Sequence, residues 1–226
     1  MRRVYIIVEG QTEQEFVNDV IRPYLNDFGV YAVIPILIHT SKIGRGGFVN
    51  YQHLSNTIKP LLASKSNDFI VTTFVDFFRI PNNIPNYTNC ISLPDREAQV
   101  DALEQAINND INDSRFFSYI QLHEFEALLF TNNSGFEKYK EDNISLRTKE
   151  IVENYSNPED INTTPEGAPS KRILAIDEQY NKVVDGNIIA LEIGINDMLS
   201  RCPRLNTWVK NIITKATYPP LRGQCN

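Results

Sequence analysis

The chain has 226 residues, of which 42% are hydrophobic and 22% charged, with a formal net charge of −6. This composition is typical of a globular protein and excludes disordered, collagen-like and coiled-coil chains. Apolar runs such as residues 4–8 are too short to span a bilayer, so we expect a cytoplasmic protein without membrane contact, and the acidity confines any nucleic-acid contact to a local surface.

The first predicted unit is a strand followed by a helix. Residues 4–8 (VYIIV) are β-branched, aromatic and apolar on both faces, as in a central strand covered by helices. Gly10 ends this strand. Thr12 and Glu15 form a capping box, which predicts a helix beginning at Thr12 and extending to about Leu25.

Strands and helices continue to alternate up to residue 131. We expect strands at 30–38, 69–75 and 116–122, helices near 54–62, 95–111 and 124–130, a glycine-rich basic loop at 41–50 and an irregular loop at 81–94. This alternation predicts an α/β fold with a mainly parallel sheet of about four strands and flanking helices.

The pattern changes after residue 131. Helices are expected at 145–155, 170–180, 187–199 and 206–213, separated by prolines, and no further strand is indicated. We therefore expect residues 1–131 to form the core and 132–226 a helical extension packed on it, or both to form one compact domain. The widely spaced Cys90, Cys202 and Cys225 indicate unpaired, reduced thiols.

Acidic residues follow three of the predicted strands. Glu9 follows the first, Asp76 the third, and Glu124 and Glu126 the fourth. The carboxyl ends of parallel strands form the functional edge of such sheets, and buried carboxylates are costly unless paired or bound to metal. A single acid there is commonly a helix cap, and Glu124 suits that role. The coincidence at three strand ends favours a site for a hard cation such as Mg²⁺.

Basic residues supply candidate phosphate contacts. Lys171 and Arg172 follow Ser170, a predicted N-cap, so they lie at a helix N-terminus that favours anions. The alternative is a solvated helix face. Arg45, in the glycine-rich loop, is a further candidate for binding phosphate or nucleic acid, although flexible surface loops also have this composition.

Six segments, in order, resemble a known family. They are VEGQTEQEFV (8–17), GRGG (44–47) before Tyr51, VTTFVDFF-x-IP (71–81), HEFEALLF (123–130), PEDIN with APSKRI (158–162 and 168–173), and IG-x-x-x-M-x-x-x-CP-x-x-x-x-W (193–208). Together they resemble the bacterial TOPRIM-like family catalogued as domain of unknown function 4276. The resemblance implies a TOPRIM-like (Rossmann-like) fold, similar to that of topoisomerases, primases and overcoming-lysogenisation-defect nucleases. It also implies phage defence or restriction, often beside an ATPase gene.

The resemblance also assigns residues. Glu9 corresponds to the TOPRIM glutamate and Asp76 to the first acid of the DxD motif, but the second acid is replaced by Phe78. Either Glu124 and Glu126 substitute as ligands, or the metal is bound weakly or not at all. In phosphodiester cleavage Asp76 and these two acids would hold Mg²⁺ or Mn²⁺, while Glu9 would join them or act as general base.

The expected function is a Mg²⁺-dependent nuclease or phosphotransfer enzyme acting on nucleic acid in prokaryotic defence. The alternative is a non-catalytic effector or partner subunit that docks on an ATPase and keeps the scaffold for binding. A third option is a phosphohydrolase acting on nucleotides. The sequence leaves the oligomeric state open, a homo-oligomer included.

Overall fold

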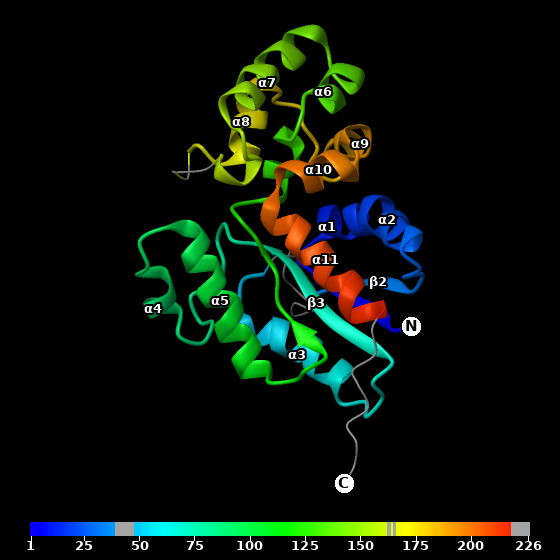
Figure 1. The fold of residues 1–226 in the computed structure, drawn as a ribbon. Helices are drawn as coiled ribbons and strands as arrows, with labels where there is room; N and C mark the ends of the chain where they lie inside the picture. The colour runs from blue at the N-terminus through cyan, green and yellow to red at the C-terminus, as the bar shows by residue number, and fades with distance from the viewer. Residues whose placement is uncertain (39–47, 162–163, 165, 218–226) are drawn as a thin grey trace.

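A computed structural model describes residues 1–38, 48–161, 164 and 166–217, and shows a sheet covered on both faces by helices (Figure 1). The strands are β1 Arg3–Val8, β2 Val33–Leu37, β3 Phe69–Asp76, β4 Phe116–Phe117 and β5 Ile120–Gln121. The helices of this part are α1 Gln11–Phe16, the π-helical η1 Val17–Ile21, α2 Arg22–Asp27, α3 Tyr51–Leu62, α4 Tyr87–Ile91, α5 Arg96–Ile111 and the 3₁₀ helix η2 Phe125–Phe130. The later ones are α6 Ser134–Tyr139, α7 Asp142–Asn154, the 3₁₀ helix η3 Pro158–Asp160, α8 Pro169–Ile176, α9 Val184–Ile193, α10 Ile195–Arg201 and α11 Pro203–Thr217.

The sheet is parallel throughout, with strand order β2-β1-β3-β4 and β5 paired to β3 further along. This confirms the expected α/β fold with a parallel sheet and flanking helices. The inner strands β1 and β3 are almost completely buried because helices cover both faces. Val8 pairs with Phe74, so Glu9 and Asp76 leave the sheet at the same edge.

The predicted strand at 116–122 is wrong in one respect, because it forms two short strands rather than one. The Thr73 side chain causes the interruption. Its hydroxyl donates to the Tyr119 carbonyl and accepts from the Tyr119 N–H, both at 2.7 Å. The Thr73 hydroxyl thus replaces the backbone hydrogen bonds to β3 at the point between β4 and β5. The chain resumes pairing with β3 at Ile120.

The first helix also begins differently from the prediction. α1 starts at Gln11, directly after Gly10, and no side chain caps it. The capping box of Thr12 and Glu15 is therefore wrong, since Thr12 lies inside the first turn and is buried. The loop at 81–94, expected to be irregular, contains the short helix α4.

Helices α1, α2 and α11 lie along one face of the sheet and α3 and α5 along the other (Figure 1). The cluster on the α1 side contains Val4 and Phe16 together with Phe136, Ile189 and Trp208 from beyond residue 131. The C-terminal helices therefore share a hydrophobic core with the sheet. The boundary between 1–131 and 132–226 stays a prediction.

The expected helix at 187–199 is divided in two. Gly194, at φ +82°, ends α9 and starts α10, because this left-handed conformation does not continue a helix. None of the described helices combines the length and the apolar character needed to cross a bilayer. Cys90 and Cys202 are buried free thiols, whereas Cys225 lies outside the described residues.

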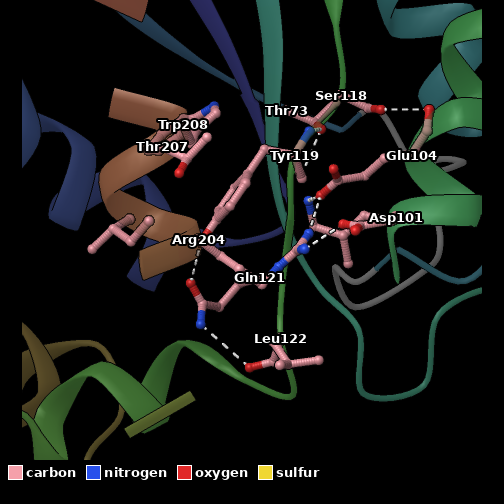
Figure 2. A network of polar contacts seen from close by, with 12 residues as sticks. Thr73, Asp101, Glu104, Ser118, Tyr119, Gln121, Leu122, Arg204, Thr207 and Trp208 are labelled. Atoms are coloured by element: carbon pink, nitrogen blue, oxygen red, sulfur yellow. Dashed lines mark hydrogen bonds and ion pairs between the residues drawn. The ribbon is translucent and has the colours of Figure 1, made fainter. Parts of the chain in front are cut away.

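A polar network joins α5, the β4–β5 segment and α11 (Figure 2). The Arg204 guanidinium pairs with Asp101 and, at 2.8 Å, with Glu104. On α11, the Trp208 indole N–H donates to the Thr72 hydroxyl at 2.9 Å. The Trp208 ring stacks on the Tyr119 ring, with the ring centroids 4.8 Å apart. These contacts hold the last helix against β3.

Glu159 makes the stability of this region depend on pH. It is fully buried and accepts the N–H groups of Arg204 and Leu205 at the start of α11. Burial raises its pKa from 4.5 to about 7, although those N–H groups act in the opposite direction. The folded state thus favours the protonated form, so the stability from this group is greatest below pH 4.5 and is lost as pH rises to about 7.

The expected result is a fall in the free energy of unfolding across that interval, with a contribution from Glu159 of at most about 1.4 kcal/mol per pH unit. Urea unfolding of the wild type and of Glu159→Gln at several pH values measures it. The glutamine variant, which does not ionise, should show the shallower dependence. Equal slopes for the two proteins would contradict the assignment.

Candidate functional site

Carboxylates from four segments converge at the carboxyl edge of the sheet. They are Glu9 after β1, Glu13 on α1, Asp76 at the end of β3 and Glu126 on η2. A lysine from the segment before α9, Lys182, reaches the same place. Three of the predicted acids, Glu9, Asp76 and Glu126, are therefore brought together, and two residues that were not predicted join them.

Lys182 has its amine between the acids. Its Nζ lies 3.3 Å from Glu13 Oε1, 3.3 Å from Glu126 Oε2 and 3.6 Å from Asp76 Oδ2. The Lys182 side chain is 39% exposed, whereas those of its three partners are at most 8% exposed. Burial acts to lower the pKa of Lys182, but the carboxylates outweigh it and raise that pKa well above its usual range. The amine therefore remains a cation.

Asp76 has a structural role as well as a place in the cluster. Its Oδ1 accepts the N–H of Phe125 at 2.9 Å and so caps the start of η2, while Oδ2 faces Lys182. This capping places Glu126, in the first turn of η2, on the same side as Asp76. Asp76 therefore both belongs to the cluster and positions Glu126 within it.

The two acids after β5, Glu124 and Glu126, have different partners. Glu126 joins the cluster, whereas Glu124 accepts the N–H and the hydroxyl of Ser170 at 2.9 and 3.0 Å. Glu124 therefore caps α8, and the expected N-cap, Ser170, is wrong because α8 starts at Pro169 with Ala168 before it. The backbone is extended at Glu124 and helical from Phe125, and the charge of Glu124 still acts on Glu126 and Lys182.

Sequence reasoning missed Glu13, although a signal was present. Glu13 precedes Phe16, Val17 and Val20 by three, four and seven residues, which places it on the buried face of the helix. An acid on an apolar face requires a partner. Gly10 leaves it room, since a Cβ there would lie 3.2 Å from the Glu13 carboxylate. Lys182, by contrast, lies in no motif and carries no such signal.

The cluster gathers four carboxyl groups near a single lysine, Lys182. Burial, and then the charge of Glu13, raises the pKa of Glu9, while N–H groups of Phe48 and Asp76 partly offset this. Burial raises the pKa of Asp76 well above its usual range and that of Glu126 to about 7, with neighbouring carboxylates adding to both. Further positive charge would therefore be favourable here.

The donor set suits a divalent cation such as Mg²⁺ or Mn²⁺. All four acids offer hard oxygen ligands, and Glu126 Oε2, buried to 1% exposure of its side chain, accepts no hydrogen bond. Within the described part of the chain, however, no group of three or more acidic, histidine or cysteine side chains is placed so that it could hold a metal ion. The Lys182 amine lies between the carboxylates, so a metal would have to share or take its place.

Within the described residues, Lys171 and Arg172 form no ion pair with the acid cluster. The Arg172 side chain donates to the Gly167 carbonyl at 2.7 Å and to the Tyr155 hydroxyl at 3.2 Å. Lys171 is exposed on α8, with no ion pair recorded among the described residues. Arg45 and the GRGG loop lie outside the described residues. Binding of phosphate by these three residues stays a prediction.

Two residues that lie next to the acids in the chain have positive φ. Arg79 and His123 have φ values of 61° and 68°, and the Phe78 N–H donates to the His123 carbonyl at 2.7 Å. Such conformations cost roughly 1–3 kcal/mol each for side chains like these and are concentrated at functional sites. Burial, and then Arg96, lowers the pKa of His123 to about 4, so this histidine is neutral at physiological pH.

Comparisons with known proteins identify a family and a similar solved structure. A family model described as domain of unknown function (DUF4276) matches residues 8–213. No curated protein matches the chain. Among solved structures, the C-terminal region of the Burkholderia pseudomallei OLD protein is similar, at 14% sequence identity and a TM-score of 0.48, with 96% of this chain and 97% of that one covered.

Proposed function

The chain belongs to the DUF4276 family, and we propose that this member is a Mg²⁺- or Mn²⁺-dependent phosphodiesterase that acts on nucleic acid. The observation that supports the proposal is the convergence of Glu9, Glu13, Asp76 and Glu126 at the carboxyl edge of a parallel sheet. Four carboxyl groups near one cation, with the pKa values of Glu9, Asp76 and Glu126 raised, are typical of a functional site.

In this proposal Asp76, Glu126 and Glu13 hold the metal, and Glu124 supports them by fixing α8. A bound divalent ion would neutralise the phosphate, lower the pKa of a water and stabilise the leaving oxygen. Glu9 lies at the edge of the same cluster, where its raised pKa suits a residue that accepts a proton from the attacking water. Lys182 remains charged and would stabilise the negative charge that develops on the phosphate.

A second candidate function has its own supporting observation. Lys182 already neutralises part of the acid cluster, and Phe78 replaces the second DxD acid. Both features suit a non-catalytic effector or partner subunit that keeps the scaffold for binding. Isothermal titration with Mg²⁺ and Mn²⁺ separates the candidates, because the non-catalytic protein is expected to bind neither.

The biological setting belongs to the proposal as well. Phage defence and an ATPase partner rest on the resemblance and on no contact in the structure, and a homo-oligomer stays open. The partnership is tested by expressing the tagged protein together with a neighbouring ATPase gene and asking whether the ATPase co-purifies with it.

Cleavage assays test the proposed activity. Purified protein with end-labelled DNA or RNA should cut at least one of them in Mg²⁺ or Mn²⁺ and neither in EDTA. Turnover of nucleotides without cleavage of either polymer would instead favour a small-molecule phosphohydrolase.

A further inference from the structure

Arg79 occupies a tight turn directly after Asp76. The Ile80 N–H donates to the Phe77 carbonyl at 3.1 Å, which closes a turn with Arg79 in its third position at φ 61°. Glycine or asparagine normally occupies that position, because a Cβ is disfavoured at positive φ. Arg79 is therefore held in a backbone conformation that its Cβ makes unfavourable.

Positive φ outside glycine occurs at four of the described residues. Among the described residues, the others outside glycine with positive φ are Asn86, Asn112 and His123. The two asparagines lie at the ends of α4 and α5, where this residue type is tolerated. Arg79 and His123 have no such explanation. Both lie on loops after the strands that carry the acids, and the Phe78 N–H joins the two loops.

The charge of Arg79 is free for a ligand. Its guanidinium lies over the Phe78 ring at 5.2 Å, the side chain is exposed, and no carboxylate within the described residues pairs with it. Other arginines, such as Arg115 and Arg204, are engaged with acids. Arg79 follows Asp76 by three positions, so their Cα atoms lie within about 11 Å. The ring of Phe78, at the position of the missing DxD acid, thus supports a cation close in the chain to Asp76.

We propose that Arg79, supported by Phe78, binds the phosphate that flanks the one at the acid cluster, so that the substrate is a polynucleotide strand. This inference rests on the proposed function and deepens it. A site rich in carboxylates repels a polyanion, and a cation at its rim offsets that repulsion. Each phosphate that a protein contacts also contributes to the salt dependence of binding.

The test uses Arg79→Gly, which removes the charge and relieves the positive φ, so the variant should unfold at the same temperature as the wild type or higher. Asn86→Gly is the matched control, because it relieves a positive φ outside the site. Binding is measured by fluorescence anisotropy with labelled DNA and RNA of about 20 nucleotides. Asp76→Asn serves as the background so that the probe is not cut.

Arg79→Gly should weaken binding of the oligonucleotides about tenfold and lower the slope of log K against log salt by about 0.7, as expected for the loss of one contact to a single strand. Asn86→Gly should change neither value, and Arg79→Lys should recover most of the affinity. Unchanged affinity and slope in Arg79→Gly would overturn the proposal.

Cleavage gives an independent readout with the Asp76 side chain intact. With Mn²⁺, the kcat/KM of Arg79→Gly should fall at least tenfold more on an oligonucleotide than on bis(4-nitrophenyl) phosphate, which has a single phosphate. Equal losses on both substrates would overturn the flanking-phosphate role. If the wild type cuts neither substrate while Arg79→Gly still weakens binding, the proposed phosphodiesterase is wrong and the role of Arg79 in binding stands.

Discussion

Replacement of Asp76 by asparagine should lower metal-dependent cleavage by about 10³-fold or more, equivalent to roughly 4 kcal/mol of transition-state stabilisation. Asparagine removes the charge that faces Lys182 but keeps an oxygen that can accept the Phe125 N–H. The cap of η2, and with it the position of Glu126, should therefore survive. The loss is expected in kcat/KM for cleavage of labelled DNA or RNA, with a thermal melt close to that of the wild type.

A matched pair on α1 provides the control. Glu13 and Glu15 lie two residues apart, but only Glu13 reaches Lys182. Glu13→Gln should reduce cleavage strongly, by about 10²-fold or more, whereas Glu15→Gln should stay close to the wild type. Full activity in Asp76→Asn and Glu13→Gln would place the chemistry elsewhere. Equal losses in Glu13→Gln and Glu15→Gln would point to a general effect on the helix.

Replacement of Lys182 by methionine should destabilise the metal-free protein, because three buried carboxylates lose their nearest cation. Removing one partner of a buried ion pair typically costs about 3–5 kcal/mol. The Lys182 side chain is 39% exposed, and solvent screening reduces the expected loss to about 2 kcal/mol. Urea unfolding in EDTA measures it. The exposed Lys171, changed to methionine in the same way, should shift stability by less than about 0.5 kcal/mol.

Mg²⁺ distinguishes a metal site from a purely structural ion-pair cluster. If the acids bind the ion, adding it should restore most of the stability of Lys182→Met, since a ligand that binds the folded state stabilises it. Its affinity should also rise about tenfold over that of the wild type, because the competing amine is gone. A stability deficit that persists in saturating Mg²⁺ would identify Lys182 as a permanent structural counter-ion and support the non-catalytic alternative.

Local sequence signals were sufficient for most of the first half of the fold. The apolar runs that became β1 and β3 are short and rich in β-branched residues, so length and composition both indicate strands. The ends of strands and helices could not be predicted where a side chain from another segment forms hydrogen bonds with the backbone. Thr73 divides the last strand through its own hydrogen bonds, and Glu124, from a distant segment, caps α8. No local pattern reports such contacts.

The candidate site shows the same division. The order of residues alone predicts that Glu9 and Asp76 share an edge, because parallel strands have their carboxyl ends on one side. Glu13 could also have been predicted from the helical spacing of its apolar neighbours. Lys182 could not, because it comes from a segment without motif or period, and only the packing of α9 against α1 and η2 brings it to the acids.

The sequence by itself determined the parallel α/β architecture and the edge at which acids gather, since both follow from hydrophobic period and strand direction. Only the tertiary structure decided which acids face one another, that Lys182 lies between them, and that Arg79 has a positive φ. These features depend on distances between segments far apart in the chain. Such distances are determined by packing of the whole core, and no single segment of the sequence specifies them.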